Sequence, residues 1–327
     1  MRVLSGIQPT GQAHIGNYFG AIKSWVAQQE LQDSYFTVVD LHAITIEHDP
    51  KELYLGTLEL FATLLAAGLD QDKCTLFVQS HVAAHANLAW LMECTVSMGE
   101  LNRMTQFKDK GRGSESVRAG LFTYPALMAA DVLLYQADKV PVGDDQKQHL
   151  ELTRDLAMRF NRLYGEVFTV PEPSIPTIGA RIMDLSNPTK KMSKSSSSPA
   201  GIIYLLEPAD QIKKKISKAV TDTDNCVEYD PQNRSGISNL LEIFGVATGK
   251  DPRSIAQSYS SYGALKNDLT EVLVTNLAPI RDRLNNLLDD KAELARLMRM
   301  GAEKAEITAN ETLQRAQDAV GFVPRSQ

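Results

Sequence analysis

Residues 35–39 have the sequence YFTVV, a run of aromatic and β-branched side chains. Such a run is typical of a strand that is buried on both faces of a parallel sheet. A helical period follows over 51–68, with Gly68 at its end, and a second short apolar run, TLFV, occupies 75–78. The order strand, helix, strand predicts a βαβ unit.

The alternation of short apolar runs and longer helical periods continues through residue 185, with a further helix expected over 85–98. It predicts an α/β fold with a Rossmann-like, doubly wound parallel sheet whose ligand site lies at the carboxyl ends of the strands. Beyond residue 201 the helical periods dominate, which predicts a C-terminal all-helical domain. We expect its helices over 207–219, 237–248, 251–260, 264–289 and 291–320, with a break in the fourth at Pro279.

Two polar segments divide the chain. Residues 108–118, KDKGRGSESVR, interrupt the first domain and predict a mobile loop or a crossing linker. Residues 190–201, KKMSKSSSSPAG, have the composition of a linker, although a lid loop over a ligand shares that composition. We therefore expect a first domain over 1–189, a loop over 190–201, and a helical domain over 202–327 whose last helices pack back on the first.

Charge and cysteine content exclude some classes of protein. The 327 residues carry a net charge of −6, from 40 acidic and 34 basic side chains, so any contact with nucleic acid has to be local. The three cysteines, Cys74, Cys94 and Cys226, are far apart, which argues against a disulfide framework or a clustered metal site and fits a reducing compartment. No signal peptide or membrane span is expected, because the least polar long stretch, 119–137, contains a proline and an aspartate.

A glycine-rich loop, SGIQPTGQAHIGNYFG, follows the first short strand over 5–20. Its glycines allow close approach of a phosphate to the backbone, and the helix expected near Asn17 offers unpaired N–H groups. A P-loop is excluded, because Gln12 and Ala13 stand where a lysine and a serine or threonine are required, and no strand is followed by G-x-G-x-x-G. The remaining element, His14 to Asn17, taken alone fits simple turn and N-cap chemistry as well as phosphate binding.

The two polar stretches together resemble the signatures of the class I aminoacyl-tRNA synthetases. His14-Ile15-Gly16-Asn17 resembles the HIGH element, and Lys191-Met192-Ser193-Lys194-Ser195 matches the KMSKS element in full. Further stretches narrow the resemblance to the tryptophanyl-tRNA synthetases, and it runs essentially from end to end. These stretches are GIQPTG at 6–11, DLHAIT at 40–45, MTQFK at 104–108, YPALMAAD at 124–131 and VGDDQKQH at 142–149.

The resemblance implies a tryptophan–tRNA ligase that uses ATP with Mg²⁺. Such an enzyme joins L-tryptophan to AMP, releases pyrophosphate, and transfers the aminoacyl group to tRNA(Trp). In-line phosphate chemistry of this kind depends on positioning and on cations, so no protein nucleophile or protein-bound metal motif is needed. The resemblance also implies a catalytic first domain, a helical anticodon-binding domain, a homodimer and a cytoplasmic location.

The resemblance also assigns roles to single residues. Lys191, Lys194, His14 and Asn17 would act on the phosphates, with 190–201 as a mobile lid. The remaining residues of the ATP site would be Gln8, Pro9, Thr10, Gly16, Gly143, Asp144, Asp145, Ile182, Met192, Ser193 and Ser195. Tryptophan would meet Asp131 through its indole N–H, Met128 through its ring, and Tyr124 and Gln146 through its ammonium group.

The chain departs from common members of the family at three places. Ser196, Ser197 and Ser198 replace acidic or asparagine residues after the signature, Asp144 replaces a glutamate, and Leu4 replaces a phenylalanine. The tether of the closed loop, the contact made by Asp144 and the pocket wall are therefore open questions.

Several alternatives remain open at this stage. Asp131 lies in an apolar context, where an internal ion pair or a protein N–H would satisfy it as well as an indole. A tyrosyl-tRNA synthetase, another nucleotidyl transferase with a similar loop, or an idle paralogue that only binds tRNA would share many of these features. His81 and His85 have the spacing of a zinc protease motif but lack its glutamate, so a loop and a helix start are expected there. Lysines 213, 214, 215 and 218 form a solvated helix face or touch tRNA phosphates.

Overall fold

The computed structural model describes residues 1–105, 107–108, 117–141, 143, 146–174, 181–193, 199–224 and 226–324. The core of the α/β part is a five-stranded sheet in which every neighbouring pair of strands is parallel. The strand order is β3-β2-β1-β4-β5, so the order reverses between β1 and β4. The predicted Rossmann-like doubly wound sheet is confirmed. The strands are β1 (Arg2–Ile7), β2 (Asp33–Val38), β3 (Thr75–Val78), β4 (Lys139–Pro141) and β5 (Glu172–Ser174).

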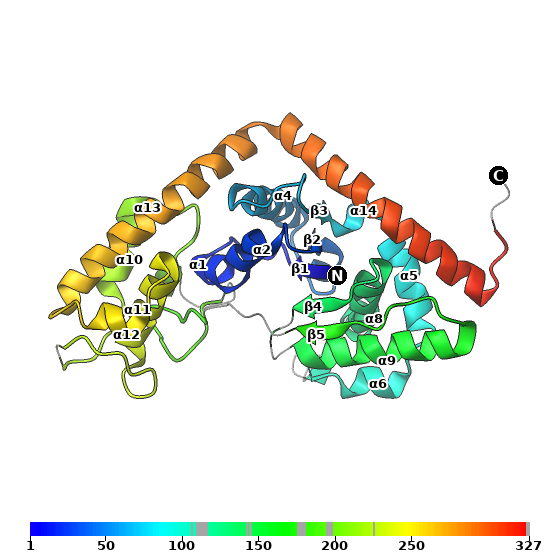
Figure 1. The fold of residues 1–327 in the computed structure, drawn as a ribbon, viewed down its shortest axis with the longest axis horizontal. Coiled ribbons are helices and arrows are strands. Elements are labelled where there is room, and N and C mark those ends of the chain that lie inside the picture. The colour runs from blue at the N-terminus through cyan, green and yellow to red at the C-terminus, as the bar shows by residue number, and fades with distance from the viewer. Residues whose placement is uncertain are drawn as a thin grey trace.

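Helices cover both faces of this sheet (Figure 1). The predicted helix over 51–68 is α4, which starts at Pro50 because the Asp49 side chain accepts hydrogen bonds from the N–H groups of Lys51 and Glu52. The helix expected over 85–98 ends earlier, at Glu93. The helices of this part are α1 (Ile15–Asn17), the π-helix η1 (Tyr18–Ile22), α2 (Lys23–Gln28), α3 (Asp40–Ala43), α4 (Pro50–Ala66), the 3₁₀-helix η2 (Gln79–His81), α5 (Ala84–Glu93), α6 (Met98–Arg103), α8 (Ala119–Leu134) and α9 (Lys147–Tyr164).

The last third of the chain is helical, and the predicted break at Pro279 is wrong. The helix α13 is continuous through Pro279, because Leu273 and Leu277 lie on a face that is fully buried and outweighs the loss of one backbone hydrogen bond. The elements here are the 3₁₀-helix η4 (Pro199–Gly201), α10 (Ala209–Lys218), α11 (Ser235–Thr248), α12 (Pro252–Ala256), α13 (Tyr262–Asp289) and α14 (Lys291–Val320).

Two apolar clusters fill the molecule, one on each face of the sheet. Phe36 and Val38 of β2 point into the first cluster, which continues through Met192 into the buried leucines of α11 and α13. Tyr35 of the same strand points into the second cluster, which α5, α8, α9 and α14 complete. The first cluster therefore continues without a break from the sheet into the helical part.

The C-terminal helix α14 packs directly on β3 and α5 (Figure 1). The approach is close at Gly301, where an added Cβ would lie 1.8 Å from the carbonyl oxygen of Leu76. The hydroxyl groups of Thr308 and Tyr35 lie 3.0 Å apart in hydrogen-bond contact. Within the described residues, none of the helices combines the length and the apolar character that crossing a membrane requires.

Candidate active site

The loop after β1 places His14 and Asn17 at the carboxyl edge of the sheet. Gly11 has a φ of 65°, which turns the chain toward α1. His14 is buried at the N-cap of that helix, and its backbone N–H donates to Oδ1 of Asn17 at 3.2 Å. Gly16 is required here, since an added Cβ would lie 2.8 Å from Nδ1 of the His14 ring. The turn therefore places the side chains of His14 and Asn17 on either side of Gly16, where the backbone is not covered by a side chain.

The KMSKS segment begins on a short antiparallel pairing with residues 182–184. The N–H of Asp184 donates to the carbonyl of Lys190, and the N–H of Met192 donates to the carbonyl of Ile182, both at 2.9 Å. The buried side chain of Asn239 in α11 fixes the other edge of this pairing, since it bonds both the N–H and the carbonyl of Met183 at 2.9 Å. The N–H and the carbonyl of Met183 are thus both hydrogen-bonded to the helical part.

The two signatures meet through the backbone that follows the serine run. The N–H of Ile15 donates to the carbonyl of Ile203 at 2.9 Å, and the N–H of Leu205 donates to the carbonyl of Ala13 at 3.0 Å. Met192 is buried beside the first signature, with its Cβ 3.5 Å from the position that a Cβ of Gly16 would take. Lys191 is exposed next to it. The structure therefore brings the first signature against Met192 of the second and against the segment that follows the serine run.

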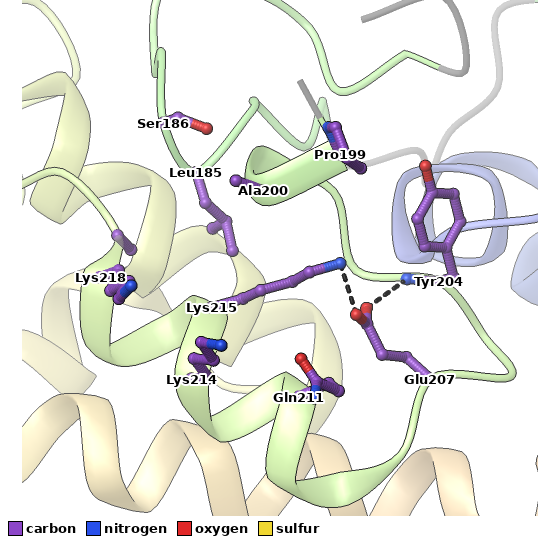
Figure 2. Close-up of a pocket in the computed structure, with 11 residues that line it drawn as sticks. Leu185, Ser186, Pro199, Ala200, Tyr204, Glu207, Gln211, Lys214, Lys215 and Lys218 are labelled. Atoms are coloured by element: carbon purple, nitrogen blue, oxygen red, sulfur yellow. Dashed lines mark hydrogen bonds and ion pairs between the residues drawn. The ribbon is translucent and has the colours of Figure 1, made fainter. Parts of the chain in front are cut away.

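An ion pair fastens the returning segment to α10. Nζ of Lys215 contacts the Glu207 carboxylate, donates to the carbonyl of Ile202 at 2.7 Å, and lies 5.0 Å above the Tyr204 ring. The N–H of Tyr204 donates to Glu207 at 3.1 Å. Tyr204, Glu207 and Lys215 line a cavity of about 510 Å³ together with Lys214 and Lys218, and Figure 2 shows how these five side chains lie. Lys215 therefore fixes the segment 202–207 to α10, whereas Lys214 and Lys218 are exposed.

Asp131 lies in α8 and is buried in the second apolar cluster, with 3% of its surface exposed. Its Oδ1 accepts from Nε2 of Gln79 at 2.7 Å and from Nδ1 of His85 at 2.6 Å, and its Oδ2 contacts Nε2 of His42 at 2.8 Å. Burial opposes ionisation of this carboxyl, but the hydrogen bonds from His42 and His85 outweigh it and lower its pKa to about 2. Asp131 is thus a buried carboxylate at neutral pH.

Tyr124 and Met128 share one face of α8 with Asp131, because positions four and three residues apart lie on the same side of a helix. The Tyr124 hydroxyl is 2.5 Å from Nε2 of the buried His149, and burial raises the pKa of Tyr124 to about 12. Gln146 caps α9 at the end of β4, and its N–H donates to the carbonyl of Gly143 at 3.0 Å. The residues predicted to bind the substrate tryptophan therefore come from α8 and from the start of α9.

The other predicted residues divide into described and undescribed ones. Gln8, Pro9 and Thr10 lie in the loop after β1, and Ile182 is buried on the 182–184 segment. The described residues contain no group of three or more side chains suited to a metal ion. Asp144, Asp145, Lys194, Ser195, the serines 196–198 and residues 109–116 of the expected loop lie outside the described residues.

Sequence reasoning missed three partners of Asp131. His42, Gln79 and His85 are separated from it by 89, 52 and 46 positions, and no sequence spacing connects them. Their common feature is their place just after β2 and β3, at the carboxyl edge where ligands bind in such sheets. His85, expected only at a helix start, does lie in the first turn of α5.

Comparisons with known proteins agree with this geometry. The family model described as tRNA synthetases class I (W and Y) matches residues 1–278. A tryptophan–tRNA ligase 2 of Streptomyces avermitilis is 54% identical, with 99% of this chain and 97% of that protein aligned. The tryptophan–tRNA ligase of Bacillus subtilis is 50% identical, over 98% and 97% of the two chains.

Solved structures give the same result. The tryptophanyl-tRNA synthetase of Campylobacter jejuni, complexed with ADP and tryptophan, has a TM-score of 0.85 and 34% identity, covering 98% of this chain and 100% of that one. That of Mycoplasma pneumoniae has a TM-score of 0.89 and 39% identity, covering 98% of both chains. A tyrosyl-tRNA synthetase of Archaeoglobus fulgidus is only 19% identical at a TM-score of 0.68, a likeness of fold alone.

The sheet, the two joined signatures and the family match define a class I aminoacyl-tRNA synthetase of the tryptophan and tyrosine group. Within that group the chain belongs to the bacterial tryptophanyl-tRNA synthetases, whose members are tryptophan–tRNA ligases. The full-length relatives near 50% identity favour this assignment over the tyrosyl alternative.

Proposed function

We propose that this chain activates L-tryptophan with ATP and then transfers it to tRNA(Trp). The observation that carries the proposal is the position of the first signature at the carboxyl edge of the sheet, where residues 13–15 pair with 203–205 and Gly16 lies beside Met192 of the second signature. In the first step a carboxylate oxygen of tryptophan attacks the α-phosphorus, the bond to the bridging oxygen breaks, and pyrophosphate leaves. The chain's role is to align these groups and to balance the charge that develops.

The phosphates would lie against the turn at the start of α1. The side-chain oxygen Oδ1 of Asn17 accepts from the backbone N–H of His14, which leaves Nδ2 of Asn17 as a donor toward a ligand. Gly16 allows a phosphate to approach the backbone. His14 would face the same phosphates, and Lys191 and Lys194 would supply positive charge from the lid. Gln8, Pro9, Thr10, Gly143, Asp144, Asp145, Ile182, Met192, Ser193 and Ser195 would complete the ATP site.

Tryptophan would lie between α8 and the edge of the sheet. Each carboxylate oxygen can accept about two hydrogen bonds. Oδ1 of Asp131 has two donors among the described residues and Oδ2 has one, so one acceptor position on Oδ2 is available to an indole N–H. Met128 would contact the ring, and Tyr124 and Gln146 would receive the ammonium group.

Mg²⁺ would enter as part of the substrate, in the complex of the ion with ATP. The described residues offer no cluster of carboxylates that would hold a resident ion. Mg²⁺ is commonly held by nucleotide phosphates, water and one or two side chains. We therefore assign no step to a protein-bound ion.

The helical part would read the anticodon of tRNA(Trp), and the exposed lysines 213, 214 and 218 of α10 are available for phosphate contacts. The ligase would act in the cytoplasm, where tRNA and ATP are both present.

A homodimer would cover an apolar groove of about 420 Å³ between α3, α5 and α8. Trp90, 62% exposed, and Ile44, 44% exposed, lie along it. Large exposed aromatic side chains mark interaction surfaces. Trp90→Glu should give a monomer at micromolar concentration in sedimentation velocity, whereas Ile307→Glu, at a position 73% exposed on α14, should stay dimeric. A wild-type monomer at the same concentration would refute this assembly.

The activity is tested by ATP–pyrophosphate exchange that depends on each standard amino acid. We expect exchange with tryptophan alone, and only when Mg²⁺ is present. Exchange with tyrosine would mean that the pocket around Asp131 has been misinterpreted. Failure to exchange with any amino acid would favour an idle paralogue that only binds tRNA.

A further inference from the structure

The ring of His85, in α5, connects two buried polar groups of the facing helix, Asp131 in α8 and Tyr135 at the C-cap of α8. It has no exposed surface, its Nδ1 lies 2.6 Å from Oδ1 of Asp131, and its Nε2 lies 2.8 Å from the hydroxyl of Tyr135. The Phe77 and Tyr135 rings lie 5.8 and 5.5 Å from it, so the imidazole has little room to turn. Both of its nitrogens thus have a fixed partner.

The partners decide which nitrogen carries the proton. An ionised carboxylate only accepts hydrogen bonds, so Nδ1 of His85 donates to Asp131. In a neutral imidazole the other nitrogen is then an acceptor, and the Tyr135 hydroxyl donates to it. The Asp131 carboxylate therefore sets the ring tautomer, and the Tyr135 hydroxyl supplies a donor to the second nitrogen of that tautomer.

The hydrogen bond from Nδ1 of His85 to Asp131 also decides which carboxylate oxygen faces a ligand. His85 and Gln79 both donate to Oδ1, whereas His42 alone contacts Oδ2. With Oδ1 fully occupied, a further donor can bind only at Oδ2. Without His85, the carboxylate would lose a donor on Oδ1 and could turn that oxygen toward the ligand.

We propose that His85, held in place by the Tyr135 hydroxyl, is a positioning residue that makes this synthetase selective for a side chain with a ring N–H donor. The inference rests on the proposed contact between Asp131 and the indole. His85 would not touch the substrate. It would act by holding Oδ2 of Asp131 ready to accept the N–H.

The test compares L-tryptophan with its benzothienyl analogue, in which sulfur replaces the indole N–H. Values of kcat/KM come from pyrophosphate exchange with wild type and with the variants His85→Leu, His85→Asn and Tyr135→Phe. Asparagine places an amide donor close to the position of Nδ1, whereas leucine offers none. Melting temperatures establish that each variant is folded.

In wild type we expect tryptophan to be preferred by about 100-fold, because the site's buried acceptor is left unpaired by the analogue. His85→Leu should reduce this ratio about tenfold or more, mainly by lowering kcat/KM for tryptophan. His85→Asn should recover most of the ratio. Tyr135→Phe should reduce it several-fold, since Nε2 of His85 then has no fixed donor and the ring is held less firmly, and it keeps the test decisive if the leucine variant does not fold.

The possible failures differ from one another. If wild type prefers tryptophan but His85→Leu and Tyr135→Phe keep the same ratio, or lower kcat/KM for both substrates equally, His85 has only a structural role and this inference is wrong, although the indole contact stands. If wild type does not distinguish the two substrates, the indole contact itself is wrong and the inference fails with it.

Discussion

The carboxylate of Asp131 shows how a charged group is kept ionised inside an apolar cluster. Three donors, from α3, η2 and α5, replace the water that burial removes. Charge-assisted hydrogen bonds of this kind are stronger than neutral ones. The Asp131 carboxylate can thus accept a further hydrogen bond at neutral pH.

Asp131→Asn should lower kcat/KM for tryptophan by about 10- to 100-fold, because a hydrogen bond to a charged acceptor contributes about 1.5–3 kcal/mol. The KM for ATP should change little. Pyrophosphate exchange measures both constants. The matched control is Asp33→Asn, which removes a half-exposed partner of Arg2 and should leave both unchanged. Equal losses in the two variants would argue against a special role for Asp131.

At this scale the sequence predicts the need of Asp131 for partners but not their identity. An aspartate within a run of alanines and leucines must be satisfied by some donor. Which donor depends on the order of strands, since His42 and Gln79 follow β2 and β3 in the folded chain. That proximity is a property of the sheet and cannot be deduced from residue types.

At the scale of elements, the helix α6 is fixed to α9 by one carboxylate. Glu100 accepts from the N–H and hydroxyl of its N-cap Ser97 at 2.8 Å, and from Nη1 of Arg159 at 2.9 Å. The hydrogen bond from Arg159, aided by the bonds from Ser97, lowers the pKa of Glu100 from 4.5 to about 2, although burial opposes this. Folding therefore favours the ionised form.

Glu100→Gln should reduce the free energy of unfolding by about 1–2 kcal/mol at pH 7. The contribution of the carboxylate is complete above pH 4.5 and is lost as the pH falls toward 2, so the gap between wild type and variant should narrow over that range. Urea unfolding at several pH values measures it. Glu303→Gln, in an exposed pair with Arg299, should show almost no gap at any pH.

The side chain of Asn239 in α11 holds the segment 182–184, against which the KMSKS segment begins. Asn239→Ala would leave the N–H and the carbonyl of Met183 without their partner and loosen residues 182–184. We expect the KM for ATP to rise about tenfold, measured by pyrophosphate exchange, with a smaller effect on the KM for tryptophan. Asn285→Ala, at an exposed position of α13, is the control. An unchanged KM for ATP would separate this segment from nucleotide binding.

Elements differ in how far the sequence determines them. The run TLFV forms β3 over the predicted residues, because apolar β-branched and aromatic side chains suit a buried strand. The three-residue strands β4 and β5 carry too few side chains to show a period. At Pro279 the local rule predicts a break, but burial of the leucine face of α13 overrides it.

At the scale of the molecule, α14 joins the end of the chain to the sheet. Gly301→Ala would place a Cβ 1.8 Å from the Leu76 carbonyl oxygen, between two backbones that cannot yield independently. We expect a loss of about 3 kcal/mol or more in urea unfolding. In the control Gly263→Ala the added Cβ meets nothing within 4 Å, and stability should be kept or rise by up to about 1 kcal/mol. Equal stability of the two variants would refute the tight docking of α14.

The two signatures show the limit of sequence reasoning for the whole molecule. Their order along the chain identifies the family, but the pairing of 13–15 with 203–205 and the core shared with α11 and α13 depend on tertiary packing. A boundary set by composition at residues 190–201 marks a change of secondary structure, whereas the apolar core continues across it.

The docking of α14 on β3 also has a consequence for synthesis of the chain. Ala302, Ala305 and Ala309 complete the second apolar cluster, whose other members come mostly from the first half of the sequence. The ribosome makes the chain from its N-terminus, so the strands and α5 emerge well before the helix that covers them. The α/β part therefore cannot finish folding until translation is almost over, and a chain that stops before α14 would expose this apolar surface to chaperones and proteases.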